Sequence, residues 1–382
     1  MAKTPPAQTE KPEQTASAQA TAYLQSTKDD HYNFEPDNYY KVPSSSLNLT
    51  LELTGGLCTG AHRFIGITAG GKTSCALDFM LNFLRGHGKN KGDNFGVYFR
   101  CEGRLSPEVQ SRSGVPFTLN PTDWKPGTCL IVDTNVYEVV FGFIRELITK
   151  NEKGNKYFFV IDSVDSMARR EDLSKPLEEA DKVAGGALIT SVFLKKTAVA
   201  LAKRGHIIVF ISQVREEIKL NQYQVTTPRQ GKSSGGHAIE HGASCVLDFL
   251  PRNSDDVLRL DPSDRNSKAV GHHCKVRIVK SDNENYNKLT YPIKYGRTGG
   301  ASVWREAELV NMMIMWEHLK RKGEKGSWFT VEEKLHKSLQ EVCPDVPDKF
   351  QGIDNVRAFL EENPKVCQFL YEKYVNVLSG VK

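Results

Sequence analysis

The sequence predicts an α/β protein with an open, largely parallel sheet flanked by helices, followed by a small, mostly helical C-terminal domain. Between about residues 43 and 300, short stretches rich in β-branched and aromatic residues alternate with stretches of helical periodicity. A glycine-rich loop separates one of these strands from the helix after it. Glycines at 296–300 then interrupt the alternation, and residues 301–382 have the apolar spacing of helices.

Eight segments carry the strand signal. They are HRFIGIT (62–68), NFGVYFRC (94–101), TCLIVDT (128–134), KYFFVIDS (156–163), HIIVFISQ (206–213), SCVLDFLP (244–251), CKVRIVKS (274–281) and TYPIKYG (290–296). Helical stretches separate most of them, so we expect the strands to form one sheet covered by helices.

The remaining organisation follows from composition. Residues 1–28 are rich in Ala, Thr, Gln, Pro and Ser, which predicts a disordered N-terminal tail, and a transition segment, 29–42, leads into the core domain at 43–300. No apolar run reaches the ~18–20 residues of a membrane helix, and no secretory signal opens the chain. The eight cysteines form no CxxC pair, which indicates a reducing interior. A net charge of +5 is compatible with an anionic polymer as partner without requiring one.

A phosphate-binding loop is present at 66–73. Gly66, four further residues and Gly71-Lys72-Thr73 match its pattern. Glycines let backbone N–H groups converge on phosphate oxygens, and the following helix adds its positive end. Lys72 is predicted to reach the β- and γ-phosphates, and the Thr73 hydroxyl to ligate Mg²⁺. The loop therefore predicts a nucleoside triphosphate as ligand. Its predicted contacts are Gly66, Ile67, Thr68, Ala69, Gly70, Gly71, Lys72, Thr73 and Ser74.

Acidic residues end two of the predicted strands. Asp162 ends an apolar strand about 90 residues after the loop, where a carboxylate helps to hold the metal placed by Thr73. The alternative is a carboxylate that caps the next helix. Glu102 ends the strand 94–101 and is a candidate to orient or deprotonate the attacking water. Its alternative is an ordinary surface acid. Ligands of open α/β sheets bind at the carboxyl ends of the strands, which favours the functional interpretation of both residues.

A long basic segment follows another strand. Gln213 ends the strand 206–213, and the 21-residue stretch from Arg215 to Gly235 has almost no apolar periodicity. Loops of this length inside compact domains are uncommon and are usually functional or disordered. Basic side chains followed by the amides of a helix start suit a phosphodiester backbone, and a plain solvated loop is the alternative. The basic side chains of this segment are Arg215, Lys219, Arg229 and Lys232, and Gly235 and Gly236 open the helix that follows.

Six motifs in order resemble those of RecA-type homologous recombinases. They are SSSLNLTLELTGGLCTGAHRFIGITAGGKTS, FRCEGRLSPEVQSRSGV, FVIDSVDSM, FISQVR, SSGGHAIEHGASCVLDF and VRIVKS, and they span about residues 43–300. The C-terminal piece, from WREAELV to LYEKY, is similar to the small domain that follows the core in bacterial RecA and phage UvsX proteins. The resemblance implies a RecA-type P-loop ATPase core.

The resemblance also assigns roles. It implies that Lys72, Thr73 and Asp162 bind ATP and Mg²⁺, and that Glu102 activates the water. Gln213 is implied to sense the γ-phosphate and to signal its presence to the DNA-contacting loop at 214–236. A second DNA-facing loop is implied at about 169–186, followed by Lys195 at a position where the family carries a basic DNA-binding residue. Lys280 is implied to reach the γ-phosphate of the neighbouring subunit, which would make hydrolysis depend on assembly.

The implied function is that of a DNA-dependent ATPase, which hydrolyses ATP to ADP and phosphate. It would form filaments on single-stranded DNA and promote strand exchange with a homologous duplex in recombination and the repair of DNA damage. Self-association and single-strand-binding or loading proteins are the implied partners. The implied location is the bacterial cytoplasm, or the host cytoplasm if the gene is phage-borne.

Three positions depart from the family pattern. Asp282 replaces a second lysine beyond Lys280, which predicts weaker charge stabilisation across the subunit interface. Val109 replaces the tyrosine that stacks on adenine, and Leu188 lies near the place of an expected arginine. The tail shows no amphipathic polymerisation helix, and no acidic tail ends the chain.

Other classes of function remain open from sequence. One is a ring-shaped motor or helicase that shares the core, and another is an accessory ATPase that binds DNA without exchanging strands. His237, Glu240 and His241 also match the H-x-x-E-H pattern of one class of zinc peptidases, but the motif is short and lies at the start of a recombinase-like helix. His272, His273 and Cys274 read better as the start of a strand than as metal ligands.

Overall fold

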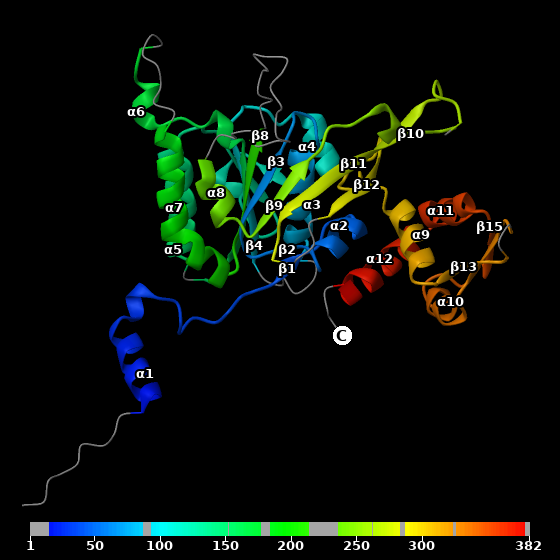
Figure 1. The fold of residues 1–382 in the computed structure, drawn as a ribbon, viewed down its shortest axis with the longest axis horizontal. Helices are drawn as coiled ribbons and strands as arrows, with labels where there is room; N and C mark the ends of the chain where they lie inside the picture. Colours follow the sequence, from blue (N-terminus) through cyan, green and yellow to red (C-terminus); the bar gives the residue numbers. More distant parts are fainter. Residues whose placement is uncertain are drawn as a thin grey trace, which may run out of the picture.

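The computed structural model describes residues 15–86, 93–151, 153–176, 184–213, 236–261, 263–282, 287–323 and 326–378. Its centre is a ten-stranded sheet with helices on both faces (Figure 1). The C-terminal domain lies beside the β11–β12 side of this sheet, and helix α1 extends away from the body (Figure 1). The predicted α/β architecture is confirmed.

The core of the sheet is parallel. In spatial order its strands are β9 (Cys245–Phe249), β3 (Gly60–Gly66), β8 (Ile207–Gln213), β7 (Lys156–Asp162), β4 (Asn94–Arg100), β6 (Cys129–Val132) and β5 (Phe117–Thr118). The carboxyl ends of β3, β8, β7 and β4 therefore meet at one edge. Residues that follow these strands are brought together there although they are far apart in sequence.

Antiparallel strands extend the sheet beyond β9. The long strand β11 (Ala269–Lys280) pairs with β9, with β10 (Val257–Arg259) and with β12 (Lys288–Lys294). A short 3-10 turn, η4 (Ser254–Asp256), precedes β10. All eight predicted strands are present, and β11 starts earlier than predicted, so that His272 and His273 lie within it.

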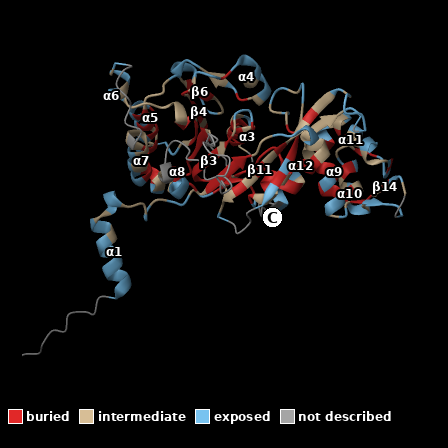
Figure 2. Cartoon of the chain, turned by 45° about the horizontal axis from the view of Figure 1, so that its top comes forward, coloured by how far each residue is buried: buried red, intermediate tan, exposed pale blue. Residues whose placement is uncertain are grey.

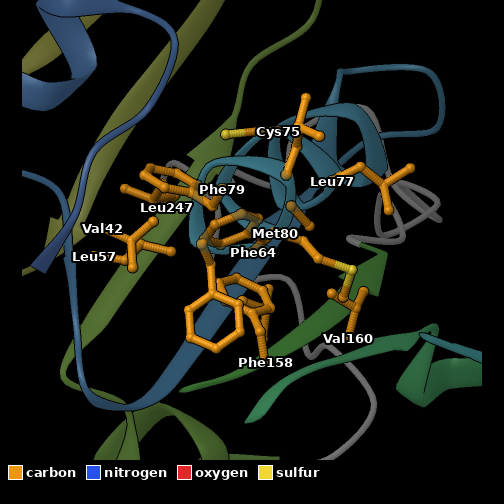
Figure 3. Packing of buried hydrophobic residues seen from close by; sticks show 14 of the residues in the cluster. Val42, Leu57, Phe64, Cys75, Leu77, Phe79, Met80, Phe158, Val160 and Leu247 are labelled. Atoms are coloured by element: carbon orange, nitrogen blue, oxygen red, sulfur yellow. The ribbon is translucent and has the colours of Figure 1, made fainter. Parts of the chain in front are cut away.

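Helices cover both faces of the sheet, and successive side chains of each central strand point to opposite faces. Helix α3 (Lys72–Leu84) packs on one face, while α5 (Tyr137–Thr149) and α7 (Ala184–Lys203) pack on the other. In β8, Ile207, Val209 and Ile211 join the α3 cluster, and Ile208 and Phe210 join the opposite one. Figure 3 shows the α3 side, where Phe64, Phe79 and Phe158 lie together. The central strands β3, β7, β8 and β9 are mostly buried, whereas α1 is exposed (Figure 2).

Helix α7 has an unusual composition. In the part of the chain that the structure describes, it is the one helix long and apolar enough to cross a membrane by length and composition, a segment that the sequence analysis did not predict. Its residues Phe193, Leu194, Ala200 and Leu201 are buried in the cluster shared with α5 and the sheet. Leu188, Val192 and Val199 of the same helix are exposed, so packing accounts for one face of α7.

Short elements connect the layers at the edge where the strands end. They are α4 (Pro107–Ser113), η2 (Pro121–Asp123), η3 (Val164–Ser166), α6 (Arg170–Leu173) and α8 (Gly236–Gly242). Helix α8 packs against α7 and β3.

The N-terminal region differs from its prediction. Residues predicted as a disordered tail form helix α1 (Ala16–Ser26), capped by the Thr15 hydroxyl and without a buried residue. The alanines and glutamines of this stretch have high helix propensity, which does not require a packing partner. After η1 (Lys28–Asp30), strand β1 (Lys41–Val42) pairs with β2 (Leu57–Cys58), and α2 (Leu47–Glu52) lies between them in sequence.

The C-terminal domain has its own core. Its elements are α9 (Arg305–Met315), β13 (Leu319–Arg321), β14 (Trp328–Val331), α10 (Glu333–Gln340), β15 (Lys349–Gln351), α11 (Ile353–Glu362) and α12 (Pro364–Leu378). The three strands form a small antiparallel sheet that the sequence analysis did not anticipate, although the domain is mostly helical as predicted. Met312 and Met313 are buried in this core, whereas Met315 is exposed.

A buried polar segment joins this domain to the core. The Ser44 hydroxyl and the Ser45 N–H donate to Asp78 of α3, at 2.7 and 2.8 Å. The Ser46 hydroxyl and the Leu47 N–H donate to Glu308 of α9, at 2.7 and 2.9 Å. The chain between β1 and α2 therefore binds one buried carboxylate from the core and one from the C-terminal domain.

Candidate nucleotide site and nucleic-acid interface

The phosphate loop has a backbone that only glycine permits at two positions. Gly66 has φ +141°, and a Cβ there would lie 2.3 Å from the carbonyl oxygen of Phe249. Gly71 has φ +109° and is the N-cap residue of α3, and a Cβ there would lie 3.1 Å from the Cys274 sulfur. The loop therefore turns tightly against β9 and β11 and leaves the N-terminus of a 13-residue helix open to an anion.

Lys72 is buried at the start of α3. Its ammonium donates to the carbonyl oxygens of Gly66 and Ile67, at 2.9 and 2.6 Å. Burial lowers the pKa of the Lys72 ammonium, while the nearby carboxylates of Asp162 and Glu102 oppose this shift. Ionised acceptors form stronger hydrogen bonds with an ammonium than neutral carbonyls do. A phosphate bound in the loop can therefore replace these carbonyls as the hydrogen-bond acceptor of Lys72.

Thr73 and Asp162 lie together as predicted for a metal pair. The Thr73 hydroxyl donates to Asp162 Oδ2 at 2.6 Å, and the Tyr98 hydroxyl donates to the same oxygen at 2.6 Å. Burial raises the pKa of the Asp162 carboxyl, although these hydrogen bonds oppose the shift. A hydroxyl and a carboxylate beside a phosphate loop are the oxygen ligands that Mg²⁺ takes in nucleotide sites, where phosphates and waters complete its shell. The residues present therefore fit ATP with Mg²⁺.

Glu102 and Gln213 are in direct contact. Gln213 Nε2 donates to Glu102 Oε1 at 2.8 Å, and the Ser163 hydroxyl donates to the same oxygen. The Glu102 N–H donates to the carbonyl oxygen of Asp162 at 3.2 Å, which fixes the backbone of Glu102 beside the metal pair. The Gln213 N–H in turn donates to Asp165 Oδ2 at 2.6 Å. The ends of three strands that are distant in sequence, β4, β7 and β8, thus form one hydrogen-bonded group.

A cavity lies beside the N-terminal half of α3. It is lined by Ser74, Cys75, Leu77, Asp78, Val109, Arg112, Ser113, Tyr291, Ile293, Gly300, Ser302 and Val303. Val109 contributes an aliphatic wall where the family resemblance led us to expect an aromatic ring. Within the described residues, the buried Ser302 hydroxyl has no hydrogen-bond partner. The cavity adjoins Ser74, so it lies where the nucleoside of a loop-bound nucleotide can extend.

The predicted DNA-contacting residues are only partly described. Lys195 is exposed on α7, and Gly236 is the first residue of α8. Lys280 donates to the carbonyl oxygens of Glu240 and His241 at the end of α8, at 3.2 and 3.0 Å. Five other candidates lie outside the described residues: Arg215, Lys219, Arg229, Lys232 and Gly235.

Two residues of the site were missed by sequence reasoning. Tyr98 reads as one more apolar strand residue, and Ser163 as a neighbour of Asp162. Only the parallel register of β4 and β7, which sets Tyr98 opposite Val160, reveals that the Tyr98 hydroxyl can reach Asp162. In the described part of the chain, no group of three or more His, Cys, Asp and Glu residues is arranged to hold a metal ion.

Comparison with known proteins gives consistent matches. Residues 37–298 match the family model of the RecA N-terminal domain. Protein RecA of Mycobacterium avium is 27% identical over 336 residues, which cover 87% of this chain and 81% of the relative. Protein RecA of Frankia alni is 27% identical over 338 residues, with 87% and 82% coverage. Protein RecA of Bifidobacterium breve is 27% identical over 342 residues, with 88% and 73% coverage. The segment matched by the family model contains the phosphate loop, Glu102, Asp162 and Gln213.

Proposed function

The chain belongs to the RecA family, and on this premise we propose that it is a DNA-dependent ATPase that forms filaments on single-stranded DNA and exchanges strands with a homologous duplex. The observation that carries the proposal is the 2.8 Å hydrogen bond from Gln213 to Glu102. This hydrogen bond links Glu102, the candidate to orient the attacking water, to Gln213, the last described residue before the basic segment 214–235.

The chemistry follows from the arrangement of this group. Lys72 and the amides of the loop bind the β- and γ-phosphates, and Thr73 and Asp162 hold Mg²⁺. The metal, when bound, neutralises phosphate charge that develops during transfer. Glu102 orients the attacking water and accepts its proton. Since Gln213 donates to a Glu102 oxygen, a displacement of Gln213 changes how this carboxylate can meet the water.

DNA provides that displacement in the proposed mechanism. Arg215, Lys219, Arg229 and Lys232 are the cations that would bind phosphates of a single strand, and Lys195 adds an exposed cation on α7. Binding through phosphates releases counterions, so the affinity should fall steeply with salt concentration. ATP would favour the DNA-binding state, and hydrolysis would release it.

Assembly is part of the proposal. In the part of the chain that the structure describes, the Lys280 ammonium donates to two backbone carbonyls at the end of α8, and in a filament it can turn to the γ-phosphate of a neighbouring subunit. The proposed setting is the bacterial cytoplasm, or the host cytoplasm for a phage gene, where single-strand-binding or loading proteins would assist assembly.

The test is ATP hydrolysis with Mg²⁺, with and without single-stranded DNA, for the wild type, Lys72→Ala and Glu102→Ala. The proposal predicts that DNA stimulates the wild type and that both substitutions abolish turnover. Electron microscopy of the ATP-bound protein on DNA should show filaments. Closed rings would instead indicate a motor or helicase, and DNA binding without strand exchange would indicate an accessory ATPase.

A further inference from the structure

Arg63 is a buried arginine in the middle of the central sheet. It lies in β3, opposite Phe210 of β8 and Val246 of β9, and only 3% of it is exposed. Together with Lys72 it makes up the buried lysines and arginines of the described chain. Lys72 has a role in the phosphate loop, whereas the functional assignment so far gives Arg63 none.

Two carboxylates face this guanidinium from different elements. Glu240 of α8 approaches it at 4.0 Å, from Arg63 Nη1 to Glu240 Oε2. Asp165 of η3 is close enough to act on it electrostatically. Burial lowers the pKa of Arg63, and both carboxylates oppose that shift. The alternation of β3 places Arg63 on the same face as Ala61, the face covered by α7 and α8.

One of these carboxylates contacts the residue that precedes segment 214–235, and the other lies in the helix that follows it. Asp165 accepts the N–H of Gln213, the last residue of β8, at 2.6 Å. Glu240 lies in α8, which begins at Gly236. Arg63 itself precedes the phosphate-loop residue Gly66 by three positions in the same strand. One buried cation of the phosphate-loop strand therefore faces carboxylates from η3, which contacts the end of β8, and from α8.

A purely structural role explains this residue poorly. Taking a guanidinium out of water is costly, and the replacement of all partners of a buried ion pair by apolar side chains is often neutral or stabilising. All the strand neighbours of Arg63 are apolar, so a methionine would suit the position by packing alone. The charge at this position therefore requires an explanation other than stability.

We propose that Arg63 is a positioning residue that holds the end of β8 and helix α8 in register with the phosphate-loop strand, and that DNA stimulation of hydrolysis depends on it. The inference rests on the proposed function. It assigns to Arg63 a role in transmission between DNA and nucleotide, and no contact with the reacting atoms.

The experiment compares Arg63→Met, Arg63→Lys and Glu240→Gln with the wild type. ATP turnover is measured without DNA and with saturating single-stranded DNA, and thermal unfolding is followed in parallel. In Arg63→Met we expect DNA stimulation to fall about tenfold, in the usual range of coupling between linked sites. Its turnover without DNA should remain at the wild-type value, while thermal unfolding measures the stability lost with one partner of a buried ion pair. Glu240→Gln should lose stimulation in the same direction, and Arg63→Lys should retain part of it.

A second arginine–carboxylate pair provides the matched control. Arg204 at the end of α7 donates to Glu35 at 2.7 and 2.9 Å, away from the site, so Arg204→Met and Glu35→Gln should keep full stimulation. Wild-type stimulation in both Arg63→Met and Glu240→Gln would overturn the inference. It would equally be overturned if stimulation fell only in proportion to DNA-free turnover and thermal stability. If Arg63→Met fails to fold, DNA stimulation of Glu240→Gln provides the test, because Glu240 is half-exposed and its substitution disturbs the core less. A wild type that DNA does not stimulate would refute the proposed function instead.

Discussion

Substitution of Glu308 by glutamine is expected to change how the stability of the protein depends on pH. Glu308 is fully buried, and its carboxylate accepts hydrogen bonds from the Ser46 hydroxyl and the Leu47 N–H. Burial raises the pKa of the Glu308 carboxyl from 4.5 to about 7, and the negative charge of Asp78 adds to the shift. The folded protein therefore keeps a proton at Glu308 under conditions where the unfolded chain has lost it.

The size of the effect follows from linkage. For an acid with a raised pKa in the folded state, the stabilising contribution is complete below pH 4.5 and is lost as the pH rises through about 7. Since one pKa unit corresponds to about 1.4 kcal/mol, the loss amounts to about 3 kcal/mol. Glutamine does not ionise and reproduces the shape of the protonated acid, so the variant escapes this loss.

Guanidinium unfolding of both proteins between pH 4.5 and pH 8.5 measures the difference. The free energy of unfolding of the wild type minus that of Glu308→Gln should fall by about 3 kcal/mol across this range, most steeply between pH 5 and pH 7. Glu362→Gln, at an exposed position in α11, should show no such trend. A pH-independent difference for Glu308→Gln would refute the assignment of a protonated acid at this junction.

Three further substitutions test the nucleotide site. Gly66→Ala places a Cβ 2.3 Å from the Phe249 carbonyl oxygen at a φ of +141°, so calorimetry should detect no ATP binding; wild-type affinity would contradict the loop geometry. Glu102→Gln should lower turnover about 100-fold and leave ATP affinity intact, and a parallel loss of affinity would show that Glu102 binds rather than activates. Lys280→Ala should lower DNA-stimulated turnover about 100-fold if the cation acts across an interface, whereas unchanged turnover would favour an accessory ATPase.

The sequence predicts the parallel core well because its signal is local. The strands of this core are buried on both faces, so each reads as a continuous apolar run, and turn residues separate the runs. Their order in the sheet follows from crossovers and hydrophobic faces that no single segment reveals. The small sheet of β13, β14 and β15 was missed because its strands are only three or four residues long. Helix α1 was missed because a helix without a buried face has no apolar periodicity.

The residues of the site likewise divide into those that the sequence predicts and those that it does not. Asp162 and Glu102 lie at strand ends, and Lys72 and Thr73 begin the helix after the loop that follows β3, so their meeting at one edge is predictable from topology. Tyr98 and Arg63 lie inside strands, where a side chain with a polar end cannot be distinguished by pattern from ordinary strand residues. Their roles depend on which strands are neighbours, and that is tertiary information.

The most direct test of the account is the DNA dependence of ATP turnover in Gln213→Ala. Gln213 directly precedes the segment 214–235, and its Nε2 donates to Glu102 Oε1 at 2.8 Å. The account predicts that single-stranded DNA stimulates the wild type and Gln368→Ala, a control in the C-terminal domain, but no longer stimulates Gln213→Ala. Undiminished stimulation of Gln213→Ala would contradict the claim that DNA controls hydrolysis through this hydrogen bond.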